Sequence, residues 1–434
     1  MKDAIYDVKE LSKGKVLMLG LQHMFAMFGA TVLVPLLTGL DVSTTLLFAG
    51  LGTLLFHVIS KGKVPAFLGS SFAFLGGYGA IAPLLEDGSS NIEMLPYACF
   101  GVACAGLVYA VFSALIKVFS AQKVMSFFPP VVTGPIIIAI GLTLSKSAID
   151  NCNSNWLIAI VAIVVVIICN IYGKGMIKII PILLGVIASY TVAILMGEVD
   201  FAPVKEAAWF DFPIRFELTV FALFGENFDG SKLIASVLTI MPIALATIVE
   251  HVGDISAISS TTGVNYIKEP GLHRTMLGDG LATMLSSIFG GPANTTYGEN
   301  TGVLNLSKVY DPKVVRLAAI FAVIFSFCPK IASVIQVMPK ATVGGISLIL
   351  YGMISAVGVR NVVEHQVNFT KSRNVIIAAL ILVLSIGVNY SAAGAIMFQI
   401  GEITISLSGL AAGALVGIIL NAILPEKDFE LNAM

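Results

Sequence analysis

The residues best suited to chemistry are two carboxylic acids that follow a long apolar run. Glu250 and Asp254 are four residues apart in the string Ala246-Thr247-Ile248-Val249-Glu250-His251-Val252-Gly253-Asp254. In a helix this spacing puts both carboxylates on one face, about one turn apart. Two such groups in a medium of low dielectric are hard to ionise together, so the pair is suited to carrying a proton. A solvated helix end is the alternative interpretation of the same string.

A second polar string interrupts an apolar region further along the chain. It reads Asn294-Thr295-Thr296-Tyr297-Gly298-Glu299-Asn300-Thr301-Gly302 and lies between two apolar runs. Non-helical backbone at membrane depth is tolerated only where it lines a cavity or is buried in protein. Glu299, with amides, hydroxyls and glycines beside it, offers acceptors and donors for a flat polar ligand. An ordinary external loop is the alternative.

Three other apolar runs hold weaker candidates. Either phenyl ring of Gly69-Ser70-Ser71-Phe72-Ala73-Phe74 is suited to stacking on a flat ligand, a contact worth about 0.5 to 1.5 kcal/mol beyond area burial. Gln22 and His23 lie in the first apolar run, where a lone histidine is more often a structural donor than a proton relay. Asp279 lies between two glycines, and we expect it to tie helices together instead of touching a ligand.

The composition of the whole chain excludes an ordinary soluble protein. Of the 434 residues, 57% are hydrophobic and 12% are charged, whereas a soluble domain is about 25% charged. A formal net charge of -1 provides no basic surface for nucleic acid. The five cysteines lack C-x-x-C spacing and the chain has no P-loop, so we expect no metal, no cofactor and no nucleotide drive.

Apolar windows predict the elements that position these residues. A bilayer core of about 30 Å requires about 20 apolar residues in each helix. By this measure we expect an all-α polytopic membrane protein with fourteen transmembrane spans, which centre on residues 16-38, 42-60, 65-83, 94-116, 124-145, 156-172, 178-197, 233-253, 273-290, 293-306, 314-328, 338-358, 374-390 and 403-424. Glycine, proline and asparagine interrupt the third and tenth windows, so we expect both to be broken spans.

The distribution of positive charge predicts the orientation of the spans. Short cytoplasmic loops hold an excess of lysine and arginine. With the N-terminus inside, most of the 25 Lys and Arg residues fall on the cytoplasmic side, and the exceptions are Lys146, Lys205, Arg215, Lys232, Lys330 and Lys340. We therefore expect a multi-pass protein of the cytoplasmic, or inner, membrane with both termini in the cytoplasm.

The longest polar stretch, residues 198-232, divides the spans into two halves of seven. Because seven is odd, the second half enters the membrane from the opposite side, and any internal repeat must be inverted. The two broken spans are then third in each half. Interrupted spans at corresponding positions of two halves indicate the binding site of a transporter near the midplane.

At these positions the sequence resembles the nucleobase-ascorbate transporter family, and specifically its uracil permease branch. The resemblance rests on a set of strings, which are Gln22-His23 with Phe25-Ala26-Met27-Phe28-Gly29-Ala30-Thr31-Val32-Leu33-Val34-Pro35, Gly69-Ser70-Ser71-Phe72-Ala73-Phe74, Glu250-His251-Val252-Gly253-Asp254, Pro270-Gly271-Leu272-His273-Arg274 and Asn294-Thr295-Thr296-Tyr297-Gly298-Glu299-Asn300. The last string is the most specific, because purine and xanthine members usually have Gln-Asn in place of Gly-Glu-Asn.

The resemblance implies two inverted seven-span repeats with short extended strands in spans three and ten. It also implies a core domain of spans one to four and eight to eleven, and a gate domain of the remaining spans. The boundaries that follow are core at 1-118 and 233-330, gate at 119-197 and 331-434, and an external linker at 198-232. Relatives of this branch are similar in moving uracil with protons, and often assemble as homodimers through the gate domain.

The same resemblance assigns roles to individual residues. Substrate binding is expected of Ala30, Phe72, Glu250, Tyr297, Gly298 and Glu299, proton coupling of His23, Glu250 and Asp254, and structural support of Gln22, Ser71 and Asn300. Because some uracil permeases have histidine at the position of Asp254, the way in which this residue shares a proton with Glu250 stays open.

Three alternatives stay open beside this assignment. The first is transport of xanthine, uric acid or ascorbate by the same fold. The second is an anion transporter of related architecture, for which the sequence lacks arginine or lysine at the broken spans. The third is a membrane enzyme acting on lipid, for which no nucleophile, base and orienting group recur together.

Overall fold

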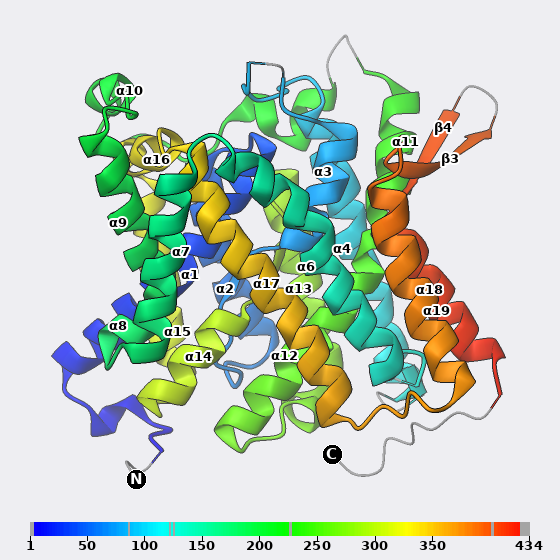
Figure 1. Ribbon diagram of the computed structural model, residues 1–434. Coiled ribbons are helices and arrows are strands. Elements are labelled where there is room, and N and C mark those ends of the chain that lie inside the picture. The colour runs from blue at the N-terminus through cyan, green and yellow to red at the C-terminus, as the bar shows by residue number, and fades with distance from the viewer. Residues whose placement is uncertain are drawn as a thin grey trace.

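The computed structural model describes residues 4–85, 87–120, 123–124, 126–224, 228–400 and 403–425. Helices dominate this part of the chain (Figure 1). In the first half they are η1 (Val8–Glu10), α1 (Lys13–Thr38), α2 (Val42–Ile59), η2 (Phe72–Phe74), α3 (Leu75–Ile81), α4 (Leu95–Phe119), α6 (Pro130–Cys152), α7 (Trp156–Tyr172), α8 (Met176–Ile179), α9 (Pro181–Leu195), α10 (Ala202–Glu206), η3 (Phe216–Leu218) and η4 (Val220–Phe224). In the second half they are α11 (Gly230–Ile240), η5 (Met241–Ile243), α12 (Ala244–Thr262), η6 (Ile267–Gly271), α13 (Leu272–Ile288), α14 (Gly298–Ser307), α15 (Pro312–Ser326), α16 (Pro329–Gln336), α17 (Lys340–Glu364), α18 (Ser372–Asn389) and α19 (Gly409–Ile423).

Local sequence signals explain where the first helices begin and end. The Ser12 side chain caps α1 by accepting from the backbone N–H of Lys15, and Asp41 caps α2 by accepting from the N–H of Thr44 at 2.7 Å. These caps satisfy N–H groups that have no partner within the helix. Gly39 follows α1 with a φ of 79°, a left-handed conformation that glycine adopts without strain.

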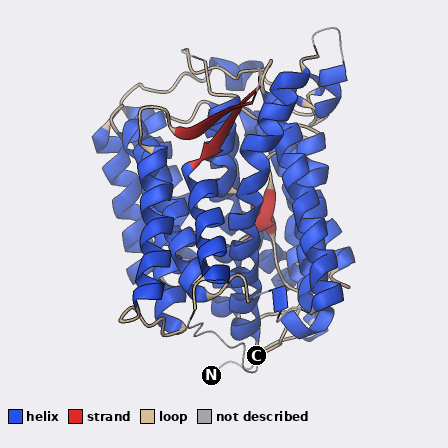
Figure 2. Cartoon of the chain, turned by 90° about the vertical axis from the view of Figure 1, so that its right-hand side faces the viewer, coloured by secondary structure: helices blue, strands red, loops and turns tan. Residues whose placement is uncertain are grey.

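Two short strands lie in the two windows that glycine and asparagine interrupt. β1 (Leu68–Ser70) precedes α3, and β2 (Asn294–Thr296) precedes α14. They pair antiparallel, with Gly69 opposite Thr295. The pair lies about halfway up the bundle in Figure 2, where the backbone groups of each strand find their partners in the other. Each window therefore holds a strand followed by a short helix instead of one continuous helix.

The strand pair brings together segments more than 220 residues apart in the chain, as the hydrogen bond between Tyr297 and Ser70 shows. Around it pack α1, α2, α4, α12, α13, α14 and α15, of which α13 lies against both α4 and α2, and α15 against both α2 and α1. A second group consists of α6, α7, α9, α17, α18 and α19, in which α17 packs along α6 and α7, and α18 along α19 and α6. The two groups meet along α12, which contacts α6 and α19, and along α1, which contacts α9 and α17.

Several predicted boundaries were wrong. The window 233-253 ends too early, because α12 continues to Thr262 and so holds Glu250 and Asp254 in its interior. The window 403-424 is not one helix, because β4 (Ile403–Ser408) pairs with β3 (Ala395–Ile400) in a hairpin before α19 begins. The window 124-145 is displaced, because α6 begins at a proline, which is favoured in the first turn, and continues to Cys152.

The predicted division into core, linker and gate stays a prediction, although some of its boundaries fall inside helices. Residues 198-232 include α10, η3, η4 and the first turn of α11, and the boundary after residue 330 falls inside α16. By length and apolar composition, seven described helices are able to cross a membrane. The number is eight if α15 and α16, which are bent by 85°, are taken as one span.

Candidate functional site

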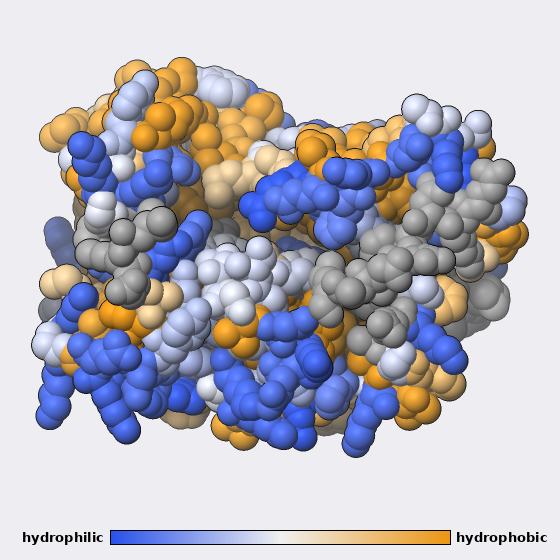
Figure 3. Space-filling view, turned by 90° about the horizontal axis from the view of Figure 1, so that it is seen from below, coloured by the Kyte–Doolittle hydropathy of each residue, from blue (hydrophilic) through white to orange (hydrophobic). Residues whose placement is uncertain are grey.

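A cavity of about 1490 Å³ lies between the two groups of helices. Its inner end is at the strand pair, where Ser70, Phe72 and Tyr297 line it. Its lining continues along α12 and on to Lys268 in η6, and along α17 to His365 just after that helix. Figure 1 places the ends of α12 and α17 at the same end of the bundle as the start of α1, and Figure 3 shows that hydrophilic side chains gather on that face. The cavity therefore extends from the middle of the molecule to the end where α1 begins.

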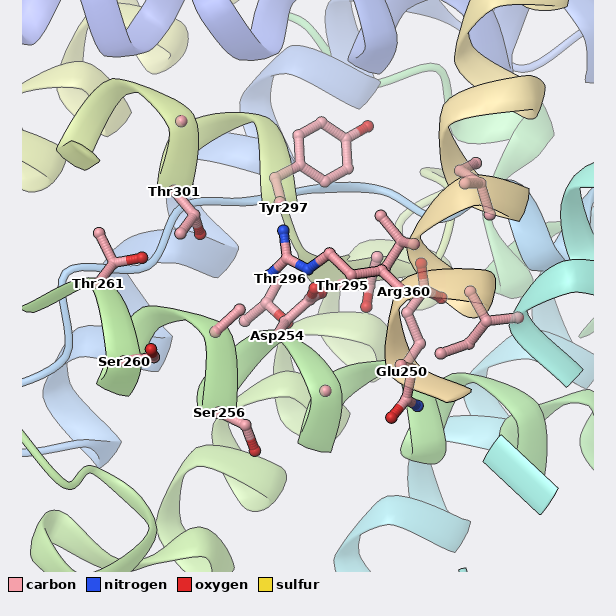
Figure 4. A pocket seen from close by; sticks show the side chains of 18 of the residues that line it. Glu250, Asp254, Ser256, Ser260, Thr261, Thr295, Thr296, Tyr297, Thr301 and Arg360 are labelled. Carbon is pink, nitrogen blue, oxygen red and sulfur yellow. The ribbon is translucent and has the colours of Figure 1, made fainter. Parts of the chain in front are cut away.

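The predicted acid pair lines this cavity. Glu250 and Asp254 lie one turn apart on α12, together with Ser256 and Ser260 further along the helix (Figure 4). Asp254 Oδ2 accepts a hydrogen bond from the Thr296 hydroxyl of β2 at 3.2 Å. The two carboxyl groups therefore both line the cavity, and Asp254 contacts the strand pair directly.

Tyr297 joins the two strands at the inner end of the cavity. Its hydroxyl donates to the Ser70 carbonyl at 2.8 Å, and its backbone N–H donates to the Phe67 carbonyl at 2.9 Å. Gly69 lies beneath its ring, where a Cβ would approach Tyr297 Cζ to 2.5 Å. Phe72 packs edge-on against Tyr351 of α17, with ring centroids 5.8 Å apart. The tyrosine therefore fixes the crossing, and the phenylalanine contacts the opposite group of helices.

Of two neighbouring residues predicted to bind substrate, the structure describes Gly298 but not the side chain of Glu299. Gly298 lines the cavity, and a Cβ there would lie 3.8 Å from Asp254 Oδ1. The absence of a side chain leaves the first backbone groups of α14 open toward the acids. The Glu299 side chain lies outside the described part of the chain, so its role stays a prediction.

The predicted supporting residues lie behind the cavity. The Asn300 side-chain amide lies 3.1 Å from His23 Nδ1 and 3.2 Å from the His23 carbonyl, and the imidazole is fully buried. Ser71 extends the strand pairing, since its N–H donates to the Ala293 carbonyl at 2.9 Å. Gln22 and Ala30 are also buried in α1. The structure thus brings Phe72, Glu250, Asp254, Tyr297 and Gly298 to the cavity, while Gln22, His23, Ala30, Ser71 and Asn300 are absent from its lining.

The sequence interpretation missed the cationic side of the cavity. Arg360 of α17 lines it, and Figure 4 shows the guanidinium extending across the view toward Asp254 and Thr296. Its Nε lies 2.9 Å from Oε1 of Glu364, one turn further along the same helix. The sequence signal for Arg360 was its position just after an apolar run. The run alone does not show which face of α17 lines the cavity. No group of three or more His, Cys, Asp or Glu suited to a metal occurs among the described residues.

A loop beside the cavity entrance carries an exposed ion pair. Lys63 contacts Glu269 between α12 and α13, and this hydrogen bond lowers the pKa of the Glu269 carboxyl below its usual range. Close by, the Tyr6 hydroxyl donates to the Thr262 carbonyl at 2.6 Å, which ties the N-terminal segment to the end of α12. Charged and polar contacts therefore hold together the segments at this end of the bundle.

Comparison with known proteins finds relatives along the whole chain. The model of the Permease family matches residues 14–394. The uracil permease of Bacillus caldolyticus is 39% identical over an alignment 448 positions long, which covers 100% of this chain and 99% of that protein. The uracil permease of Bacillus subtilis (strain 168) is 38% identical, with 94% of this chain and 92% of that protein covered.

A solved structure shares the fold at much lower identity. The transmembrane domain of a cyanobacterium bicarbonate transporter, BicA, aligns with a TM-score of 0.61 and 15% identity, covering 97% of this chain and 100% of that chain. This likeness bears on the fold alone. The match to the family model and the relatives that align along the whole chain show family membership. This multi-pass membrane protein belongs to the Permease family, the nucleobase-ascorbate transporter family.

Proposed function

We propose that this protein is a symporter that imports uracil together with protons across the cytoplasmic membrane. The observation that carries the proposal is the position of Glu250 and Asp254 in a cavity that begins at the β1–β2 crossing. The full-length likeness to two proteins named as uracil permeases supports uracil as the substrate.

The groups at the inner end of the cavity match the chemistry of uracil. Uracil presents two N–H donors, two carbonyl acceptors and two flat faces. The Glu250 carboxylate accepts from a ring N–H, Gly298 offers backbone contact, and Phe72 offers an aromatic face. Glu299 provides a second acceptor in this proposal. Adenine lacks the ring carbonyls and would leave the polar groups of such a site unpaired, which lowers its affinity by a large factor.

We infer an inverted repeat of fourteen spans, with the first packed group as the core domain and the second as the gate domain. The strands of β1 and β2 support this repeat, because they occur third in each half and pair with each other. The separate packing of the two helix groups supports the division. Uracil then crosses by an elevator-like or rocking movement of the core against the gate, and the gate joins two copies in a homodimer.

In this proposal the structure represents the inward-facing state of the transporter, because the cavity opens at the cytoplasmic end of the bundle. The end of the bundle at which α1 begins is cytoplasmic, as the excess of lysine and arginine in its loops favours. Loading of a proton onto Glu250 or Asp254 lowers the cost of closing a dry site around uracil. The membrane potential adds about 2.3 kcal/mol per charge for each 100 mV.

Uptake by proteoliposomes tests the proposal. Purified full-length protein is reconstituted, and accumulation of radiolabelled uracil is followed with an inward proton gradient, without a gradient, and with a protonophore. We expect accumulation above equilibrium only in the first condition. Equal uptake in all three conditions would contradict proton coupling.

A panel of unlabelled competitors separates the alternatives. We expect uracil to compete fully, and adenine, xanthine, uric acid, ascorbate and bicarbonate to compete weakly. Stronger competition by xanthine or uric acid than by uracil would replace the substrate with another nucleobase. Light scattering of the detergent-solubilised protein, corrected for bound detergent, tests the homodimer.

A further inference from the structure

A buried histidine–aspartate pair lies behind the cavity wall and has no part in the proposed binding of uracil. His251 of α12 and Asp279 of α13 are both fully buried, with 3.1 Å between Nδ1 and Oδ2. The other ring nitrogen of His251 lies 3.1 Å from the Thr275 hydroxyl. Burying such a pair costs free energy that well-packed apolar residues of similar volume would not. The pair therefore calls for a role other than packing.

Thr296 connects this pair to the cavity. Its hydroxyl donates to Asp254 Oδ2 at 3.2 Å and lies 3.5 Å from His251 Nδ1. Thr296 is the last residue of β2 and precedes Tyr297, which holds the two strands together. A continuous path of polar atoms thus runs from Asp254 at the cavity, through the strand, to the buried pair.

We propose that His251 and Asp279 are positioning residues that hold strand β2 in a position that depends on whether Asp254 carries a proton. The Thr296 hydroxyl connects Asp254 to this pair. The inference rests on the proposed function and extends it, because it explains how protonation of Asp254 on α12 affects the strand that borders the substrate.

The single proton of the Thr296 hydroxyl makes this connection directional. When Asp254 is ionised, the hydroxyl donates to the carboxylate, and its oxygen lies 3.5 Å from His251 Nδ1, whose N–H also faces Asp279 Oδ2 at 3.1 Å. When Asp254 is protonated, its own O–H needs an acceptor, and the Thr296 oxygen provides one. The Thr296 oxygen then accepts from Asp254 in place of donating to it, and it is less available to the Nδ1–H of His251. Protonation of Asp254 therefore changes the hydrogen bonds of β2 and of the His251–Asp279 pair.

Several titratable groups face this network, so substitution of the acids themselves would give an ambiguous result. Glu250 shares α12 with His251 and Asp254, and Tyr109 of α4 interacts electrostatically with Asp279, Glu250 and Asp254. From α17, Arg360 extends toward Asp254 in Figure 4. From β2, the Thr295 side chain and the Thr296 backbone also interact with Asp279. Thr296 carries no charge itself, and its hydroxyl is the contact that the proposal needs. The experiment therefore changes Thr296.

The test measures uracil affinity from pH 5 to pH 8.5 for the purified full-length protein and for Thr296→Val and Thr296→Ser. Valine keeps the shape of threonine and removes the hydroxyl that stabilises ionised Asp254. Because a hydrogen bond to a charged group is worth about one pH unit or more, we expect the midpoint of the pH profile to rise by about one unit in Thr296→Val. Thr296→Ser keeps the hydroxyl, and we expect the wild-type midpoint.

The matched control is Thr283→Val. The Thr283 hydroxyl donates to the Asn294 carbonyl at 2.7 Å and accepts from the Asn294 N–H at 3.2 Å, so it supports the same strand without touching Asp254. We expect this control to lower thermal stability and to leave the pH midpoint unchanged. If Thr296→Val does not fold, Thr296→Ala removes the same hydroxyl with a smaller side chain.

A second readout needs no substrate. The pH dependence of the thermal midpoint of the ligand-free protein is expected to show the same shift in Thr296→Val. A wild-type pH profile in Thr296→Val, or an equal shift in Thr283→Val, would overturn the connection. Failure of the wild-type protein to bind uracil would instead refute the proposed function, and the ligand-free profile would still decide the inference.

Discussion

Gly69→Ala tests the strand crossing that forms the inner end of the cavity. A Cβ at Gly69 would lie 2.5 Å from Tyr297 Cζ and 2.8 Å from Thr31 Oγ1. Both distances are shorter than van der Waals contact. The Tyr297 ring has little freedom to move, because its hydroxyl donates to the Ser70 carbonyl at 2.8 Å. The added methyl group must therefore push β1 away from β2 or displace Tyr297.

The size of the effect follows from this geometry. Overpacking of a close-packed site costs about 1 to 3 kcal/mol. If β1 moves away from β2 to relieve the strain, the same free energy has to be recovered when uracil binds between the strands and α12. We therefore expect the Kd for uracil to rise by a factor of about 5 to 150.

Isothermal titration of uracil into the purified protein measures this change, and a thermal melt confirms that the variant is folded. The matched control is Gly76→Ala, in the helix that follows β1, where an added Cβ has no heavy atom within 4 Å. We expect the control to bind uracil as the wild type does. An equal Kd for Gly69→Ala and Gly76→Ala would refute the role assigned to the crossing.

Three further substitutions test the residues that line the cavity. Glu250→Gln is expected to raise the uracil Kd about 5- to 15-fold in equilibrium binding, because a charge-assisted hydrogen bond worth about 1.5 to 3 kcal/mol becomes a neutral one that is about 1 to 1.5 kcal/mol weaker, and an unchanged Kd would remove Glu250 from the site. Phe72→Ala is expected to weaken uracil by about 1 to 2 kcal/mol and Phe72→Tyr by less, whereas equal losses in direct binding would indicate packing against Tyr351 instead of stacking on the base. Asp254→Asn is expected to keep uracil counterflow and to lose gradient-driven accumulation in the same proteoliposomes, and full accumulation in that variant would place the proton elsewhere.

The helix that carries the acid pair shows where the apolar windows fall short. The window ended at residue 253 because a glycine and a charged residue, Gly253 and Asp254, bound the apolar run there, yet α12 continues to Thr262. The Ser256 and Ser259 hydroxyls donate to carbonyls four residues earlier in their own helix, at 2.8 and 2.7 Å. Such residues satisfy their polar groups within the helix while facing a cavity. Hydropathy alone does not distinguish this case from a helix end.

The hairpin before α19 had a signal that the windows averaged out. Apolar residues alternate with polar ones in Ile403–Ser408, a period of two that is typical of a strand. A window long enough to detect a membrane helix merges this segment with the continuous apolar run of Gly409–Ile423. The merged window therefore predicted one helix where the structure has a strand and a shorter helix.

The sequence by itself determined the features that depend on local pattern. Long apolar runs predict membrane helices because the bilayer leaves the backbone few other ways to satisfy its hydrogen bonds, and an i, i+4 spacing puts Glu250 and Asp254 on one face whatever surrounds them. Only the tertiary structure decided which distant groups meet. The pairing of β1 with β2, the contact of Thr296 with Asp254 and the burial of His251 against Asp279 each join different elements. Contacts of this kind depend on how the helices pack, and packing is a property of the whole fold that no local period encodes.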